Sequence, residues 1–229
     1  MRSPSGACIL TTNSLQLLLG SASPRRRQLI NLLGLPVAVA ISPADEDALQ
    51  ATYQGPVEKL GQWTAEQKAQ AIHTLPEAAN CVVITADTTV ILDDKELGKP
   101  RTTEHARQLL LSLRNRWHHV ITGVVVSTIV DGKLRMCGDS CDTPVMMRKY
   151  SEAEIDSYIA SGDPMDKAGA YGVQNPLFQP TERINGCYLN VVGLPLCTLV
   201  TLLAEFNVFP VARQPGGTAC LWSEQCQKH

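Results

Sequence analysis

The stretch LQLLLGSASPRRRQLINLLG, residues 15–34, indicates the fold class of this chain. Its apolar start, Leu15 to Leu19, is typical of a buried strand. Ser23 followed by Pro24 predicts a helix start, because serine accepts hydrogen bonds from free backbone N–H groups and proline suits the first helical position. An apolar stripe follows until Gly34 ends the helix. A strand that leads through a short turn into a helix favours an α/β fold.

Three consecutive arginines, Arg25, Arg26 and Arg27, occupy the first turn of this predicted helix. A helix N-terminus carries about half a positive charge, so each cation there costs roughly 0.3 to 1 kcal/mol at an exposed site. Surface arginines in such a place are usually solvated. Behind Ser-Ala-Ser, however, free N–H groups and planar guanidinium groups also suit a phosphate, and no Walker-type or GxGxxG loop competes for that role. The residues alone leave both interpretations open.

The composition limits the class of protein. With 229 residues, 44% of them hydrophobic, we expect one compact unit, with tails at residues 1–14 and 207–229 that lack periodicity. A net charge of −2 gives no global basic field for a nucleic acid or an anionic membrane. No stretch approaches the roughly 18 apolar residues of a membrane helix. Eight cysteines without CxxC or zinc spacing indicate reduced thiols, so we expect a soluble, cytoplasmic protein.

One carboxylate interrupts the most apolar segment, CVVITADTTVIL at residues 81–92, which predicts a strand. An ionised Asp87 within an apolar strand costs several kcal/mol unless it is paired, hydrogen-bonded or bound to a metal. We therefore expect it to have a partner. That partner is structural, such as Thr88 or Thr89, or it belongs to a functional site.

The rest of the chain predicts alternating helices and strands. Asp131-Gly132 predicts a hairpin turn, and Ser151 with Glu154 predicts a capping box. The further predicted elements are a strand within LPVAVAIS, an acidic loop at Asp45, Glu46 and Asp47, helices over residues 57–73, 102–116 and 196–206, and a loop-rich segment over residues 163–195.

Together these segments resemble one known family. The motifs LLLGSASPRRRQLINLLGLP, ADEDA, AEQKAQA, ITADTTVILDDKELGKP, SEAEIDSYIASGDPMDKAGAYGVQ and ERINGCYLNVVGLPL stand in the order typical of the Maf nucleoside triphosphate pyrophosphatases. The resemblance covers residues 15–206 and implies a Maf/ITPase-like fold. That fold is an elongated mixed sheet with flanking helices, whose two lobes surround a nucleotide-binding cleft.

The resemblance also implies an activity and the residues that carry it. The family hydrolyses a nucleoside triphosphate to the monophosphate and pyrophosphate with a divalent metal, Mg²⁺ or Mn²⁺, and so removes unwanted or non-standard nucleotides. Asp87 matches the proton acceptor, and Glu46 with Asp87 matches the carboxylates near the metal. The residues that match phosphate-binding positions are Ser21, Arg25, Arg26, Lys68, Lys99 and Lys167.

Three positions vary with the substrate in this family, and here they are Arg25, Thr88 and Gln174. This combination resembles the subfamily that acts on dTTP and UTP. The chain departs from the family at Asn175, where glycine is usual, and Pro176 follows it. The resemblance further implies a homodimer. An alternative function, attached to the same family, is a non-catalytic, nucleotide-responsive regulator of cell division.

Overall fold

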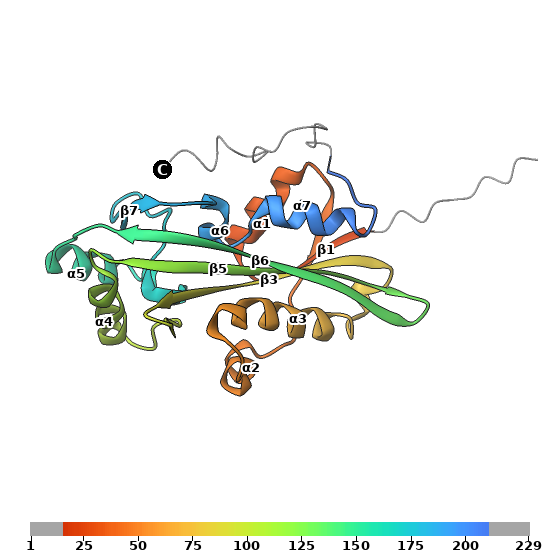
Figure 1. Ribbon diagram of the computed structural model, residues 1–229, viewed down its shortest axis with the longest axis horizontal. Helices are drawn as coiled ribbons and strands as arrows, with labels where there is room; N and C mark the ends of the chain where they lie inside the picture. Colours follow the sequence, from red (N-terminus) through yellow and green to blue (C-terminus); the bar gives the residue numbers. More distant parts are fainter. Residues whose placement is uncertain (1–15, 211–229) are drawn as a thin grey trace, which may run out of the picture.

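The computed structural model describes residues 16–210, and Figure 1 shows one long sheet with helices on both of its faces. The seven strands lie in the order β2-β1-β3-β5-β6-β7, and β4 pairs with β3. The predicted mixed sheet with flanking helices is therefore confirmed. Leu15, the predicted tail at residues 1–14 and residues 211–229 lie outside the described residues.

The sheet is parallel on one side and antiparallel on the other. Strand β1 pairs in parallel with β2 and β3, whereas the pairs β3–β5, β5–β6 and β6–β7 are antiparallel. The strands are β1 (Gln16–Gly20), β2 (Val37–Ala40), β3 (Cys81–Leu92), β4 (Lys95–Glu96), β5 (Trp117–Val130), β6 (Lys133–Met147) and β7 (Thr181–Ile184). The predicted hairpin turn joins β5 to β6, with positive φ angles of 50° at Asp131 and 71° at Gly132.

Helices α1, α6 and α7 lie on one face of the sheet, α2 and α3 on the other, and α4 and α5 near one end (Figure 1). The helices are α1 (Pro24–Ile30), α2 (Glu46–Thr52), α3 (Leu60–Ile72), α4 (Thr103–Leu113), α5 (Glu152–Ala160), α6 (Tyr188–Val192) and α7 (Leu196–Ala204). None of these described helices is long and apolar enough to cross a membrane.

The predicted residues at the ends of the helices make the expected capping contacts. Ser23 caps α1 by accepting from the Arg26 N–H at 3.4 Å, and Gly34 ends the following 3-10 turn with a φ of 67°. Ser151 and Glu154 form the predicted capping box of α5. Cys81, Cys137 and Cys141 carry free thiols, as predicted, whereas Cys8, Cys220 and Cys226 lie outside the described residues.

Four sequence predictions need correction. The acidic residues 45–47 are not a loop: the Asp45 carboxylate accepts from the Ala48 N–H at 3.1 Å and caps α2. The predicted helix over residues 57–73 begins with a separate 3-10 turn, Val57–Lys59, before α3. The segment predicted to be rich in loops also contains β7 and α6, and the last helix ends at Ala204 instead of residue 206.

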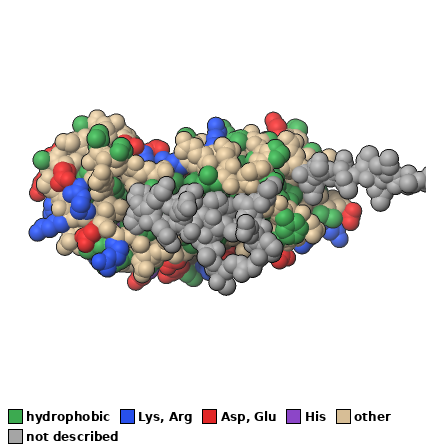
Figure 2. Space-filling view, turned by 90° about the horizontal axis from the view of Figure 1, so that it is seen from above, with side chains coloured by type: hydrophobic (Ala, Val, Ile, Leu, Met, Phe, Trp, Pro, Cys, Tyr) green, Lys and Arg blue, Asp and Glu red, His purple; other side chains and the backbone are tan. Residues whose placement is uncertain are grey.

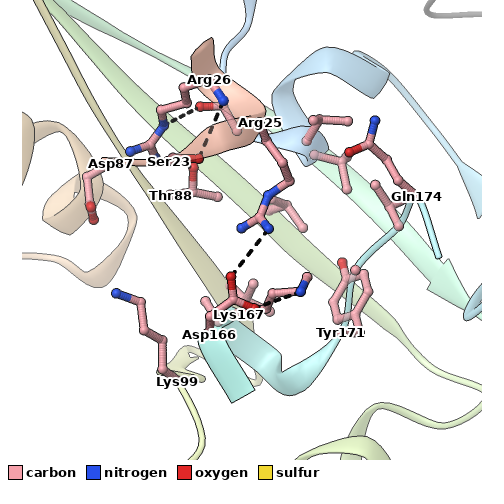
Figure 3. A pocket seen from close by; sticks show the side chains of 18 of the residues that line it. Ser23, Arg25, Arg26, Asp87, Thr88, Lys99, Asp166, Lys167, Tyr171 and Gln174 are labelled. Carbon is pink, nitrogen blue, oxygen red and sulfur yellow. Dashed lines mark hydrogen bonds and ion pairs between the residues drawn. The ribbon is translucent and has the colours of Figure 1, made fainter. Parts of the chain in front are cut away.

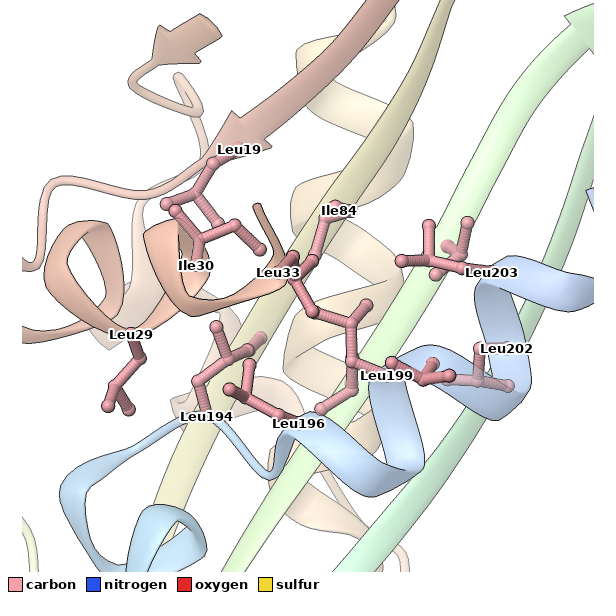
Figure 4. Close-up of a cluster of buried hydrophobic side chains, with 14 of the residues drawn as sticks. Leu19, Leu29, Ile30, Leu33, Ile84, Leu194, Leu196, Leu199, Leu202 and Leu203 are labelled. Carbon is pink, nitrogen blue, oxygen red and sulfur yellow. The ribbon is translucent and has the colours of Figure 1, made fainter. Parts of the chain in front are cut away.

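The two largest of the four hydrophobic clusters among the described residues lie at different places along the long strands. The α1–α7 core is formed by α1, α6, α7 and the strands beneath them, with Leu19, Ile30 and Leu199 fully or almost fully buried (Figure 4). The α4–α5 core includes Leu110 and Ile155, which are fully buried. Val173 packs against both cores, so the segment that carries it lies between them.

Helix α3 approaches the opposite face of the sheet very closely, and two glycines permit this. A Cβ atom at Gly123 of β5 would lie 2.2 Å from the Gln62 Cα atom, and one at Gly61 would lie 3.1 Å from the Asp87 carbonyl oxygen. A side chain at Gly123 would therefore push the helix away from the sheet. The close approach lets side chains of α3 reach the middle of β3.

Candidate functional site

A cavity of about 610 Å³ opens between the two cores. Its walls come from the β1–α1 turn, α2, the middle of β3, residues 163–176 and the connection between α6 and α7. It brings together most of the residues that the sequence singled out, namely Ser21, Arg25, Arg26, Glu46, Asp87, Thr88, Lys99, Lys167 and Gln174. Figure 3 shows the labelled side chains of Arg25, Thr88 and Lys167, which reach this cavity from elements far apart in the sequence.

The three arginines of α1 have different environments. Arg26 is buried; its Nε donates to the Gly193 carbonyl oxygen at 2.8 Å and its Nη2 to the Thr88 hydroxyl at 3.0 Å. Burial lowers the pKa of Arg26, while the charge of Asp87 opposes that effect. Arg25 points across the cavity, and its Nη1 lies 3.6 Å from the Asp166 carboxylate (Figure 3). Arg27 is exposed, so the solvated interpretation fits this arginine alone.

Lys68 lies beneath the cavity wall and is not among its lining residues. Its Nζ donates to the Glu46 carboxylate at 2.5 Å and to the Ala86 carbonyl oxygen at 3.1 Å, and lies 3.7 Å from the Asp87 carboxylate. The expected partner of Asp87 is therefore Lys68 of α3, assisted by Gln50, whose Nε2 donates to Oδ2 at 3.4 Å. Thr88, the structural alternative, bonds to Arg26 and Thr122.

The pKa values of the two carboxylates beside Lys68 are shifted in opposite directions. Burial raises the pKa of Asp87, although the positive charges of Lys68 and Arg26 oppose this. For Glu46 burial acts in the same direction, but the charge and the hydrogen bond of Lys68 outweigh it, so its pKa is lowered. Glu46 thus stays ionised, whereas Asp87 accepts a proton more readily than an ordinary aspartate.

The lysines that line the cavity already face carboxylates. Lys99 Nζ lies 3.5 Å from Glu46 Oε2, with its side chain 56% exposed. Lys167 Nζ donates to Asp163 Oδ1 at 3.0 Å and to Asp166 Oδ1 at 2.7 Å. The exposed Lys99 can turn toward an incoming anion at small cost, because surface ion pairs contribute little, whereas the Lys167 side chain is only 11% exposed and is held by both carboxylates. On the face shown in Figure 2, basic and acidic side chains of the described residues lie intermixed.

Glu46 and Asp87 fit a magnesium ion that a polyphosphate ligand helps to hold. No group of three or more His, Cys, Asp or Glu side chains in residues 16–210 is placed to hold a metal ion. Mg²⁺ rarely needs such a cage, since it commonly takes one or two carboxylates and completes its shell with water and phosphate oxygens. Glu46 and Asp87 both lie within 4 Å of one ammonium group, so their oxygens reach a common region.

Sequence reasoning missed several polar side chains of the cavity, namely Gln50, Glu96, Asp163, Asp166 and Tyr171. Gln50 lies one helical turn after Glu46 on α2, so recognising that helix would have placed both on one face. Glu96 of β4 also lines the cavity, and burial together with the charges of Asp87 and Asp47 raises its pKa. No sequence signal separates Glu96 from the neighbouring turn residues.

These features define a mixed α/β protein with a charged cavity at the middle of its sheet. The sequence model of the family described as Maf-like protein matches residues 16–206, and the chain belongs to this family. A dTTP/UTP pyrophosphatase of Dehalococcoides mccartyi is 39% identical over 213 residues, 92% of either chain. A dTTP/UTP pyrophosphatase of Thermomicrobium roseum is 39% identical over 210 residues, also 92% of either chain. One of Dictyoglomus thermophilum is 40% identical over 188 residues, 82% of this chain and 94% of the relative.

Replacing Lys68 should destabilise the protein strongly. Lys68→Met removes the cation between Glu46 and Asp87 and leaves buried carboxylate charge uncompensated, which costs about 3–5 kcal/mol in buried pairs. We expect this loss in the free energy of urea unfolding, with part of it recovered in the double variant that adds Asp87→Asn. The exposed Lys149 supplies a control, because Lys149→Met should change stability by no more than about 0.5 kcal/mol. Equal stability of the two single variants would contradict this assignment.

Proposed function

We propose that this protein hydrolyses nucleoside triphosphates to the monophosphate and pyrophosphate, with a preference for dTTP and UTP. One observation carries the proposal: Arg25, Lys99 and Lys167 line the same cavity as a buried carboxylate, Asp87, whose pKa is raised by burial. The curated relatives are named for this reaction, and they match this chain over most of its length.

The chain's own residues suit attack by water on a phosphate. Arg25, Lys99 and Lys167, with Ser21 and the buried Arg26, neutralise and orient the polyphosphate, which is most of what phosphoryl transfer requires. Asp87 orients the water and takes its proton, a role that its raised pKa favours. A bound Mg²⁺ or Mn²⁺, held by Glu46 and Asp87, would supply further charge neutralisation at the phosphate oxygens.

The same site disfavours the non-catalytic regulator as the main function. A protein that only binds a nucleotide gains nothing from a buried carboxylate aimed at a polyanion, because like charges repel. We propose further that the enzyme acts in the cytoplasm to remove unwanted nucleotides and needs neither a nucleic acid nor a membrane.

A homodimer is proposed on the family resemblance, and light scattering at micromolar concentration tests it, since a monomer there refutes it.

Asp87→Asn should nearly abolish turnover and leave the fold intact. The change is almost isosteric but removes the charge that holds metal or water, so we expect kcat to fall by about 100-fold or more. The measurement is pyrophosphate release from dTTP and UTP with Mg²⁺ or Mn²⁺, with circular dichroism as the check on folding. Activity within a few-fold of the unmodified protein would remove Asp87 from the mechanism. If the unmodified protein releases no pyrophosphate from any nucleotide with either metal, the proposed reaction is wrong.

Base preference should depend on Gln174. Uracil and thymine present an N3–H donor beside an O4 acceptor, which one side-chain amide can match, whereas cytosine reverses both groups. We expect kcat/KM to rank dTTP and UTP above CTP and GTP, and Gln174→Ala to compress that ranking. The Gln70→Ala variant is a control, because Gln70 is exposed on α3 and lies outside the cavity lining. A preference for CTP or a purine nucleotide would leave the hydrolase proposal standing and refute the role of Gln174.

A further inference from the structure

The loop that carries Gln174 is held by the residue next to it. Asn175 Nδ2 donates to the Asp163 carboxylate at 3.1 Å. The other end of the same amide, Oδ1, accepts from the backbone N–H groups of Leu177 at 3.1 Å and Phe178 at 2.8 Å. Asn175 therefore closes the turn that follows Gln174 and also ties it to a separate segment of the chain.

Asp163 connects that tether to a well-packed part of the protein. Its Oδ2 also accepts from the Tyr158 hydroxyl at 2.7 Å, and the same hydroxyl accepts from the Gly172 N–H at 2.9 Å. Tyr158 is buried on α5 and stacks on Phe178, with 4.2 Å between the ring centroids. The loop is thus bound before Gln174, at Gly172, and after it, at Asn175. One carboxylate, Asp163, joins both attachments.

The same carboxylate contacts the phosphate side of the cavity. Lys167 Nζ donates to Asp163 Oδ1 at 3.0 Å. Burial would raise the pKa of Asp163, but the hydrogen bonds from Tyr158 and Lys167 lower it, so this carboxylate is ionised when it accepts from Asn175. On the other side, the Gln174 side chain is hydrogen-bonded to Tyr188, which is buried at the start of α6.

We propose that Asn175, through its hydrogen bond to Asp163, is a positioning residue that fixes Gln174 and thereby sets the discrimination between uracil-type bases and cytosine. This inference rests on the proposed function and deepens it. A side-chain amide distinguishes the two bases only while its oxygen and nitrogen keep their places, because turning it over matches cytosine instead. Without the hydrogen bond from Asn175, the loop is free and the Gln174 amide can adopt both orientations. The preference for uracil-type bases over cytosine then falls, while the contacts with the phosphates remain.

Asn175→Asp tests the tether with little change in shape. Its carboxylate still accepts from the Leu177 and Phe178 N–H groups, but it has no donor for Asp163 and carries the same charge. We expect the ratio of kcat/KM for UTP to that for CTP to fall about 10-fold, as for the loss of one hydrogen bond to a charged group, mainly through KM for UTP. Asn175→Ser, which keeps an acceptor without the reach to Asp163, should act in the same direction.

Two double variants separate positioning from a general loss of structure. Adding Asn175→Asp to Gln174→Ala should lower the ratio no further than Gln174→Ala alone, because no amide remains to be placed. Combining Asn175→Asp with Asp163→Asn exchanges donor and acceptor, so the new amide at 163 can donate to the new carboxylate at 175. This double variant should restore most of the UTP-to-CTP ratio, even if the weaker contact with Lys167 lowers the hydrolysis rate of both nucleotides. An unchanged ratio in Asn175→Asp and Asn175→Ser, or an additive loss in the Gln174→Ala background, overturns the proposal.

Binding measurements keep this inference separate from the proposed reaction. Isothermal titration calorimetry with the α,β-methylene analogues of UTP and CTP gives the ratio of dissociation constants without turnover. If the unmodified protein hydrolyses no nucleotide, the reaction is refuted, and the tether is still judged by whether Asn175→Asp reduces the calorimetric ratio about 10-fold. Equal ratios in the two proteins overturn the tether regardless of catalysis.

Discussion

The site depends on one buried ammonium group beneath the central strand. Lys68 Nζ holds Glu46 at 2.5 Å and lies 3.7 Å from Asp87, so a single cation joins α2, α3 and β3. It reaches that position only because α3 lies against the sheet where Gly61 and Gly123 present no side chain. The same cation lies beside two carboxylates whose pKa values shift in opposite directions, because its short contact lowers the pKa of Glu46 while burial raises that of Asp87.

Much of the architecture follows from local sequence signals. The serine cap and proline of α1, the Asp131-Gly132 turn and the β-branched run of β3 each act over a few residues, so their chemistry can be read directly. Helix α2 has no buried residue and hence no apolar stripe, so its acidic start looked like a loop. Strand β7 is four residues long, with Glu182 and Arg183 exposed, and it forms because β6 offers an unpaired edge.

Most of the residues that the sequence predicted for the site line one cavity, but sequence patterns did not predict the contacts between them. Three adjacent arginines cannot be distinguished in the sequence. In the structure, the orientation of α1 against the sheet buries Arg26, directs Arg25 across the cavity and leaves Arg27 in solvent. Likewise, the apolar strand around Asp87 indicated that this carboxylate has a partner. It did not indicate that the partner is Lys68, on a helix that packs against the sheet. Such pairings depend on packing between distant segments, which local patterns do not encode.

In the proposed function, the residues assigned to the base and to the phosphates meet in the short segment 163–176. Lys167 and Gln174 lie seven residues apart, and both depend on Asp163, one directly and one through the loop that Asn175 closes. A ligand that draws Lys167 toward its phosphates therefore changes the charge balance at the carboxylate that holds the base-reading loop. Asp163 is ionised while it accepts from Lys167, so drawing that ammonium group away would leave the donors of Asn175 and Tyr158 to compensate its negative charge. If the protein binds nucleotides as proposed, phosphate binding and base selection would be coupled through the Asp163 side chain.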